Sequence, residues 1–282
     1  MKRGELVSKI LFVCASFSTL IVFLITFFLL EQGVTALNWD FITGMIWSPS
    51  RNLFGILPTL VGTLAVSLGA IAIATAIGLP TAIYLAEFAP FWLRNILKST
   101  IEVITGIPSV VIGFFGLMVV IPFIRNNIGG GDGSILAGWI ILAFMILPNI
   151  ITLSEDAIRA VPRSYREGSL AMGATQWQTI KNVVLPNAAS GIRASIVLGL
   201  GRALGETMAV LMVIGNPEIP WIPTSILDRV RTLTSTIAIE FSYMEWDSPH
   251  QHAIFAIGVV LFLLVTALNF VTTFVIRRNK FE

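Results

Sequence analysis

Long apolar runs separated by short polar segments dominate the pattern along the chain. A helix needs roughly 20 mostly apolar residues to cross the hydrocarbon core of a membrane. Six segments meet that requirement, at residues 9–30, 58–86, 101–124, 134–154, 188–215 and 253–276. This pattern predicts an all-α integral membrane protein with six transmembrane helices.

The first apolar run lies where a secretory signal peptide would lie. Its apolar stretch is too long for the core of such a signal, and no small-residue cleavage site follows it before Glu31. We therefore expect it to be retained as a membrane helix.

The positive charges predict the orientation of the chain, because Lys and Arg gather on the cytoplasmic side of a membrane. Six spans place both termini on one side. With N- and C-termini cytoplasmic, thirteen cations fall inside and four outside. The inner ones are Lys2, Arg3, Lys9, Arg94, Lys98, Arg159, Arg163, Arg166, Lys181, Arg193, Arg277, Arg278 and Lys280, and the outer ones are Arg51, Arg125, Arg229 and Arg231. We therefore predict cytoplasmic termini.

The composition is typical of a membrane protein and contains few residues that could bind a metal. Hydrophobic residues make up 55% of the chain and charged residues 12%, about half the charged fraction of a soluble domain. Cys14 is the single cysteine, which excludes a disulfide within the chain. His250 and His252 form an H-x-H pair without further ligands. We interpret them as surface histidines, and we predict neither a metal site nor nucleic-acid binding.

Two charges interrupt the fifth apolar segment, in GLGRALGETMAV at residues 199–210. On a continuous helix, Arg202 and Glu206 would lie one turn apart on one face. Arg202 would also lie roughly 21 Å from the inner end of a helix that starts near residue 188. A charge at such depth costs at least about 2.5 kcal/mol unless protein or water surrounds it.

Two interpretations of this pair remain open. In the first, Arg202 and Glu206 form an ion pair that only holds helices together. In the second, Arg202 presents a cation to an anion that crosses the membrane, because a guanidinium matches oxyanions with two parallel hydrogen bonds. Gly201 and Gly205 form a small-residue step that lets another helix approach closely. Glu102 is either a further polar group on the path or a residue at the membrane interface.

The inner loop at residues 155–187 is longer than a connection requires and mixes charged with apolar positions. It is either a solvated amphipathic hairpin or a docking surface for a cytoplasmic partner. Its segment EGSLAMGATQWQTIKNVVLP resembles the cytoplasmic loop signature of ABC importer permeases, with Glu167, Gly173 and the pair Leu185 and Pro186 at the signature positions. Gly168 and Ser169 stand where that family usually has two alanines, which keeps these positions small.

The resemblance extends to a narrower group. GLGRALGETMAV and its continuation to Asn216 are similar to the fifth helix of phosphate ABC transporter permeases of the PstC type. Residues 61–70, 106–117 and 233–241 agree with the same group, and the first 50 residues match it least.

The resemblance implies a type I ABC importer permease fold. Residues 1–57 would form the first membrane helix and an outer loop, residues 58–276 the core permease domain, and residues 277–282 a cytoplasmic tail. The translocation path would include Arg202, Glu206, Thr207 and Glu102. The loop would couple to an ATPase through Glu167, Gly168, Ser169, Ala171, Gly173, Leu185 and Pro186.

The resemblance also implies the partners. They are a sister permease of the PstA type, a cytoplasmic ATPase dimer of the PstB type and an extracytoplasmic phosphate-binding protein of the PstS type, assembled in the lipid of a prokaryotic cytoplasmic membrane. The chain has no G-x-x-x-x-G-K-[ST] phosphate loop. We therefore expect no cofactor on this chain, with ATP and Mg bound by the partner ATPase.

Three alternatives stay open from the residues. The substrate could be another oxyanion, such as molybdate, tungstate or sulfate, because one arginine does not distinguish tetrahedral anions. An intramembrane enzyme acting on a lipid phosphate would use Arg202, Glu206 and Glu102, but no nucleophile is paired with a base in the membrane. A self-contained channel would leave the long inner loop without a purpose.

Overall fold

The computed structural model describes residues 2–278, with the side chains of residues 7–270. Its helices are α1 (Lys2–Gly33), α2 (Trp39–Thr43), α3 (Leu57–Glu87), α4 (Phe91–Thr105), α5 (Ser109–Phe115), α6 (Ile121–Asn127), α7 (Ile135–Arg159), α8 (Arg163–Ala171), α9 (Gln176–Thr179), α10 (Leu185–Gly205), α11 (Met208–Val213), α12 (Leu233–Glu240) and α13 (Pro249–Arg278). The shorter elements are η1 (Val34–Ala36), β1 (Trp47–Ser48), η2 (Pro49–Arg51), β2 (Leu53–Phe54), η3 (Gly116–Val120) and η4 (Ile180–Val184).

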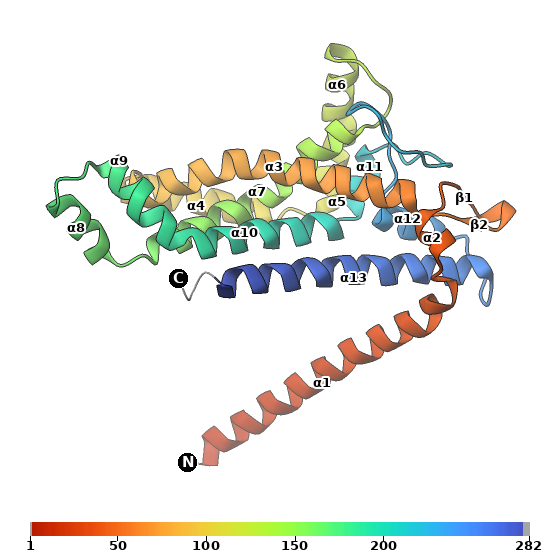
Figure 1. Cartoon of the computed structure of the whole chain (residues 1–282), viewed down its shortest axis with the longest axis horizontal. Coiled ribbons are helices and arrows are strands. Elements are labelled where there is room, and N and C mark those ends of the chain that lie inside the picture. Colours follow the sequence, from red (N-terminus) through yellow and green to blue (C-terminus); the bar gives the residue numbers. More distant parts are fainter. Residues whose placement is uncertain (1, 279–282) are drawn as a thin grey trace.

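Six helical stretches of the described residues are long and apolar enough to span a membrane. They are Val7–Ala36, Leu57–Glu87, Ser109–Asn127, Ile135–Arg159, Gln176–Gly205 and Pro249–Phe270. The predicted number of spans is therefore confirmed. The N-terminal end of α1 and the C-terminal end of α13 lie toward the same end of the molecule as α8, and the β1–β2 hairpin lies at the opposite end (Figure 1).

The predicted third helix at 101–124 is wrong in its first part. Residues 101–105 belong to α4, and the chain breaks between Gly106 and Pro108 before α5 begins. Pro108 has no N–H to donate, and it disfavours a helical conformation of the residue before it. As a result Glu102 lies on a separate helix and not inside the third span.

Two spans contain a π-helical turn directly before a proline. The N–H of Ile121 bonds to the carbonyl of Gly116, and the N–H of Leu185 bonds to that of Ile180, five residues back in each case. Pro122 and Pro186 follow these turns. Because a proline ring clashes with the carbonyl four residues earlier, the wider turn lets each helix continue past its proline.

The core of the membrane part forms where α3 packs along α7. Small side chains allow the close approach, since Ala70 and Ala74 of α3 are fully buried. A Cβ at Gly69 would overlap the ring of Trp139, whose Nε1 donates to the carbonyl of Ala65 at 2.8 Å. This tight packing fixes α7 against α3 and so positions the residues that follow Pro148.

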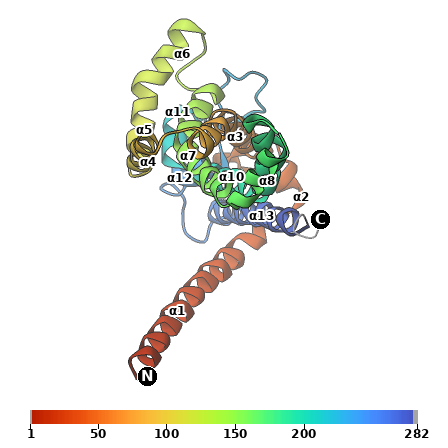
Figure 2. The same cartoon turned by 90° about the vertical axis from the view of Figure 1, so that its left-hand side faces the viewer.

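Helix α1 diverges from the remaining helices in both views (Figures 1 and 2). The C-terminal end of α1 meets the N-terminal part of α13, where the rings of Phe28 and Phe255 lie edge to face with centroids 5.6 Å apart. The most apolar part of α1 has no buried residue. In this chain alone, α1 therefore offers most of its apolar surface, apart from the contact near Phe28, to lipid or to another subunit.

Candidate functional site

The fifth span breaks at the charged motif. Helix α10 ends at Gly205, Glu206 has extended backbone with φ −70° and ψ 127°, and a new short helix starts at Met208. The predicted continuous helix over 188–215 is therefore wrong at both ends, because the helical run starts at Gln176 and stops at Gly205. Arg202 and Glu206 consequently do not share a helix face, and no ion pair joins them within residues 7–270.

Arg202 lies on an open face of α10. Leu198, Arg202 and Gly205 are exposed and follow one another at spacings of four and three residues, which puts them on one side of the helix. The guanidinium donates a long hydrogen bond of 3.4 Å to Oδ1 of Asn149 on α7. The cation therefore has a neutral amide beside it and an exposed side chain.

Asn149 is a further site residue, which the sequence-based prediction did not include. It follows Pro148 and is half-buried in α7. A polar amide inside an otherwise apolar span was the available signal, because such groups in a membrane usually face protein or a water-filled cavity.

Glu206 and Thr207 hold the break together. Oε1 of Glu206 accepts a hydrogen bond from the N–H of Ala209 at 3.3 Å, which caps the first turn of α11. The carbonyl of Glu206 accepts from the Thr234 hydroxyl of α12 at 3.1 Å, and the Thr207 hydroxyl donates to the carbonyl of Gly205 at 3.3 Å. The carboxylate of Glu206 therefore stabilises the backbone and does not neutralise Arg202.

Gly201 and Gly205 do not pack against a helix of this chain. Apart from the backbone of α10 itself, a Cβ built at either glycine would have no heavy atom of the described residues within 4 Å. Both lie beside the open face that carries Arg202. The helix-packing prediction can therefore concern only a helix of another subunit, and it stays a prediction.

Glu102 is exposed on α4, and its carbonyl accepts from the Thr105 hydroxyl at 2.6 Å. Its role on the translocation path stays a prediction. Helix α4 is fixed to α7 by a different carboxylate, Glu155, whose side chain is 1% exposed. Three cations surround Glu155, and their nitrogens lie 3.5 Å (Lys98 and Arg159) and 3.9 Å (Arg94) from its oxygens.

The groups around Lys98 raise its pKa. Partial burial by itself lowers the pKa of Lys98, but the hydrogen bond to Asp156 and the charge of Glu155 outweigh burial and raise the pKa above its ordinary value. Lys98 therefore stays charged at neutral pH, and the connection between α4 and α7 persists.

The inner loop folds into a helical hairpin of α8, α9 and η4, which continues directly into α10 (Figure 1). Gly173 makes the turn with φ +84°, a conformation that favours glycine. The hydroxyls of Ser169 and Thr179 lie 2.9 Å apart and join the two arms. The sequence-predicted positions Glu167, Gly168, Ala171 and Gly173 are exposed.

The hairpin also exposes large apolar side chains. Met172 is 89% exposed, and Tyr165, Leu170 and Trp177 are about half exposed.

Leu185 and Pro186 do not end the loop as predicted, because they lie inside the helical run from Gln176 to Gly205. The π-turn that precedes Pro186 is the physical reason why this proline does not interrupt the run.

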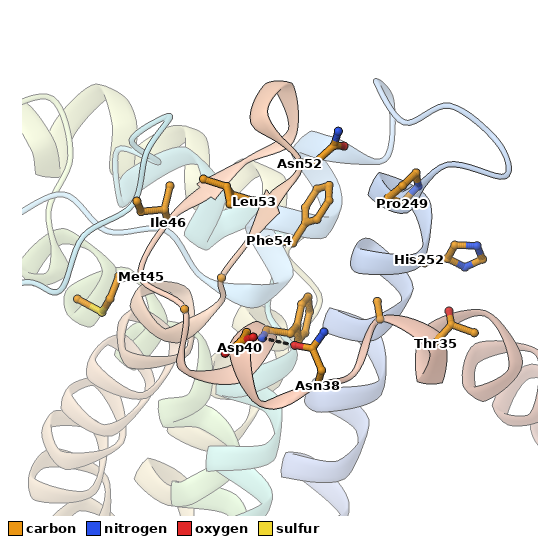
Figure 3. Close-up of a pocket in the computed structure, with 14 residues that line it drawn as sticks. Thr35, Asn38, Asp40, Met45, Ile46, Asn52, Leu53, Phe54, Pro249 and His252 are labelled. Carbon is orange, nitrogen blue, oxygen red and sulfur yellow. Dashed lines mark hydrogen bonds between the residues drawn. The ribbon is translucent and has the colours of Figure 1, made fainter.

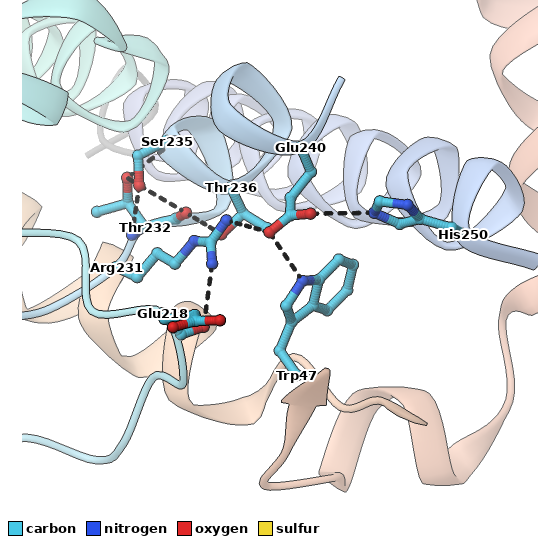
Figure 4. Close-up of polar contacts among 8 residues, drawn as sticks. All are labelled: Trp47, Glu218, Arg231, Thr232, Ser235, Thr236, Glu240 and His250. Atoms are coloured by element: carbon cyan, nitrogen blue, oxygen red, sulfur yellow. Dashed lines mark hydrogen bonds and ion pairs between the residues drawn. The ribbon is translucent and has the colours of Figure 1, made fainter. Parts of the chain in front are cut away.

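A polar cluster ties together the outer segments at the opposite end (Figure 4). The carboxylate of Glu240 accepts from Arg231 at 2.6 Å and from Trp47 at 3.3 Å, and its second oxygen lies 3.2 Å from Nε2 of His250. His250 is only 14% exposed and stacks on Phe54. The interpretation of His250 as a surface histidine is therefore wrong, because it packs inside this cluster.

A cavity of about 670 Å³ lies beside this cluster, and Arg202 is not among the residues that line it (Figure 3). Its lining comes from twelve of the residues between Thr35 and Gly55, together with Pro249 and His252. No group of three or more His, Cys, Asp or Glu side chains comes together within residues 7–270.

The comparisons identify the family. A family model described as "Binding-protein-dependent transport system inner membrane component" matches residues 78–281. The chain belongs to this family. Membership makes it a transport permease rather than an enzyme, and its six spans make it a multi-pass membrane protein.

Relatives of the permease are named as permeases of ABC transporters or of phosphate transport systems. The "Probable ABC transporter permease protein YqgH" of Bacillus subtilis is 41% identical over 238 residues, which cover 83% of this permease and 76% of that protein. The "Phosphate transport system permease protein PstC" of Mesorhizobium japonicum is 33% identical over 267 residues, covering 88% and 81%. The PstC protein of Pasteurella multocida is 34% identical over 284 residues, covering 89% and 87%.

Solved structures agree on the fold of the permease. A bacterial alginate ABC transporter in complex with an alginate pentasaccharide-bound periplasmic protein matches with a TM-score of 0.69 at 14% identity, over 98% of this permease and 96% of that chain. The MetNI methionine ABC transporter in an inward-facing conformation matches with a TM-score of 0.63 at 22% identity, over 82% and 98%. The predicted ABC importer permease fold is thereby confirmed.

Proposed function

We propose that the chain is a permease subunit of an ATP-driven phosphate importer and that Arg202 and Asn149 line the path of inorganic phosphate. The names of the PstC relatives support phosphate as the substrate. None of the relatives reported above is named for molybdate, tungstate or sulfate.

The single observation that carries the proposal is the exposed guanidinium of Arg202. It lies in the last turn of α10, directly before the break at Glu206, with a neutral amide at 3.4 Å and no carboxylate partner within residues 7–270. An unneutralised cation attracts an oxyanion, and the planar fork binds it through two oxygens. The amide of Asn149 can turn its N–H₂ toward the same anion.

The path would be shared with a sister permease. The face with Leu198, Arg202 and Gly205 is open in this chain, and a second subunit would close it and exclude lipid. A site with one cation in each half would hold phosphate weakly enough to release it, as conduction requires. Thr207 would lie beside this path, and Glu206 would shape it through the break.

The remaining partners follow from the same proposal. A sister permease of the PstA type would complete the path, an ATPase dimer of the PstB type would bind the hairpin of α8 and α9, and a phosphate-binding protein of the PstS type would deliver phosphate from outside. The hairpin end would then face the cytoplasm, with both termini, in a prokaryotic cytoplasmic membrane. The exposed Met172 and Trp177 offer the ATPase an apolar contact.

The test is uptake of labelled phosphate by proteoliposomes that hold the complete transporter. Arg202→Lys keeps the charge and loses the fork, and Arg202→Gln loses both. Because a hydrogen bond to a charged group contributes about 1.5–3 kcal/mol, we expect Arg202→Gln to slow uptake roughly tenfold or more. Arg202→Lys should retain an intermediate rate.

The matched control is Arg125→Gln, which also removes an arginine but one in an exposed ion pair with Asp132. It should transport at close to the native rate. Native uptake by Arg202→Gln with normal assembly would contradict the assignment of Arg202. Competition by molybdate, tungstate or sulfate at the concentration of phosphate itself would contradict phosphate as the substrate.

A further inference from the structure

The helix that would receive the movement of the ATPase is held by very little apolar packing. Helix α8 has no buried residue, and its apolar side chains Tyr165 and Leu170 are about half exposed. Since hydrophobic contact does not hold α8 to the membrane part, polar contacts must fix its position. One side chain of α8, Arg166, makes most of them.

Arg166 connects three helices at once. Its Nε and NH2 donate to Oε1 of Glu87 at 3.1 and 2.6 Å, and Glu87 is the last residue of α3. Its NH1 donates to the carbonyl of Val161 at 2.6 Å, and its NH2 also donates to the carbonyl of Ile158 at 2.9 Å, at the end of α7. The fork of an arginine is suited to this, because it binds a carboxylate and further acceptors in fixed directions.

The pair is shielded enough to be held firmly. The side chains of Arg166 and Glu87 are 20% and 10% exposed. The Arg125 and Asp132 pair, in contrast, is 51% and 74% exposed, as is usual for a weak surface ion pair. Loss of either partner at the shielded pair would leave the other charge without compensation.

Helix α3 leads from this pair to the proposed path. A Cβ at Gly78 of α3 would lie 3.0 Å from Ile150, the neighbour of Asn149. A Cβ at Gly199 of α10, one turn before Arg202, would lie 3.1 Å from Ile71 of α3. A displacement of α3 would therefore also move α7 near Asn149 and α10 near Arg202, because interiors packed this tightly transmit strain.

We propose that the ion pair of Arg166 and Glu87 is the link that passes movement of the α8–α9 hairpin to α3, and thereby couples ATP hydrolysis to phosphate movement. The inference rests on the proposed function. Both are positioning residues, because neither touches phosphate or ATP. The Ser169–Thr179 contact is a second attachment of α8. The hairpin therefore stays connected to α10 when the pair is cut, and the ATPase can still assemble.

The experiment measures phosphate transported per ATP hydrolysed in proteoliposomes with the complete transporter and the loaded binding protein. Coupling between sites in proteins typically amounts to a factor of about five or more. We expect Arg166→Gln and Glu87→Gln each to lower the ratio about fivefold, while ATPase activity and subunit assembly persist. The double exchange Arg166→Glu with Glu87→Arg should recover part of the ratio, because it restores the ion pair but not the carbonyl contacts.

Arg125→Gln is the control, because it removes another ion-paired arginine without separating α8 from α3. If Arg166→Gln prevents assembly, Arg166→Lys replaces it, since lysine keeps the charge and loses the fork. An unchanged ratio in Glu87→Gln and Arg166→Lys, with assembly intact, would overturn the link and leave the pair a structural contact.

Failure of the proposed function gives a different result. A native complex that does not transport phosphate contradicts the phosphate proposal whatever the variants do. The ratio can then be measured with the anion that the native complex does transport. The variants would still decide whether the pair couples the hairpin to the path.

Discussion

Glu206 combines two properties that substitution can separate, its charge and its role as a hydrogen-bond acceptor for Ala209. Glutamine keeps an acceptor oxygen and removes the charge, whereas alanine removes both. Loss of a helix-capping acceptor costs about 0.5–2 kcal/mol. We therefore predict that Glu206→Ala lowers the thermal stability of the purified complex and slows uptake, and that Glu206→Gln changes both little.

The comparison between the two variants tests the assignment of Glu206. If Glu206→Gln lost transport while its unfolding midpoint stayed native, the negative charge itself would act in transport and the capping role would be insufficient. Uptake and thermal unfolding measured on the same samples decide between these roles.

Asp228 provides a prediction for pH. The N–H groups of Thr224 and Ser225 donate to its Oδ2 at 2.7 and 2.8 Å, and these hydrogen bonds lower the pKa of Asp228 below its ordinary value of 3.8. A lowered pKa means that the ionised carboxylate stabilises the folded loop. This contribution is complete above pH 3.8 and is lost as the pH falls through the lower folded value.

Amide hydrogen exchange of the peptide around residues 221–231 measures this effect. Protection of the Thr224 and Ser225 amides, corrected for intrinsic rates, should fall once the pH drops well below 3.8. In Asp228→Ala the protection should be absent already at neutral pH. Equal protection in native and variant chains at neutral pH would show that the carboxylate does not hold this loop.

The residues of the candidate site differ in how well the sequence predicts them. Arg202 was predictable, because a charge inside an apolar run is costly and therefore conspicuous. Glu87 and Arg166 were not, because polar residues at the ends of apolar segments look like ordinary interface residues. Their role depends on a contact between residues that are 79 positions apart in the sequence. A local sequence pattern does not show such a contact.

At the scale of elements, α4 is attached to α7 by a carboxylate that is almost fully buried, Glu155. Removing one partner of a buried charge network costs about 3–5 kcal/mol, because the remaining charges lose their compensation. We predict that Glu155→Ala destabilises the permease by about 3 kcal/mol. Chemical denaturation of the purified chain in detergent would measure it.

Asp156→Asn is the matched control for this prediction. Asp156 also bonds to Lys98, at 3.1 Å, but its side chain is 58% exposed. Exposed ion pairs contribute about 0–1 kcal/mol, so the control should change stability little. A similar small effect of Glu155→Ala would show that α4 is held by its apolar face instead.

Hydropathy predicted the six spans but placed the boundaries of the third and fifth incorrectly. The error at the start of each of these two spans concerns a proline, whereas the fifth span also ends earlier, at Gly205. Pro108 ends one helix before the next begins, whereas Pro186 lies within a continuous run because a π-turn precedes it. A proline in the sequence does not by itself reveal which of these solutions the backbone adopts, since the choice depends on packing around it.

At the scale of the whole molecule, the sequence predicted the family fold, but it could not predict which surfaces a second subunit covers. Helix α1 has no buried residue in its most apolar part, and the Arg202 face of α10 is open. Apolar residues face lipid and protein alike in a membrane, so hydropathy does not separate these two environments. Gly201 offers a way to test which surface meets the sister permease.

We predict that Gly201→Leu weakens association with the sister permease about tenfold and leaves the stability of this chain unchanged. A Cβ at Gly201 meets no atom within 4 Å in the described chain, so the new side chain has room until a second subunit approaches. Overpacking a close interface costs about 1–3 kcal/mol, which corresponds to roughly tenfold in affinity. Co-purification with the sister permease and thermal unfolding of the single chain are the two measurements.

Gly69→Ala is the control with the opposite expectation. Its Cβ would overlap the ring of Trp139 inside the packing of α3 against α7, so the single chain itself should lose stability, by about 1–3 kcal/mol. The two glycines thus distinguish a surface that is filled within one chain from a surface that another chain fills. Unchanged association in Gly201→Leu would mean that the subunits meet elsewhere, and the Arg202 face would then open to lipid, where an unpaired guanidinium is too costly to remain.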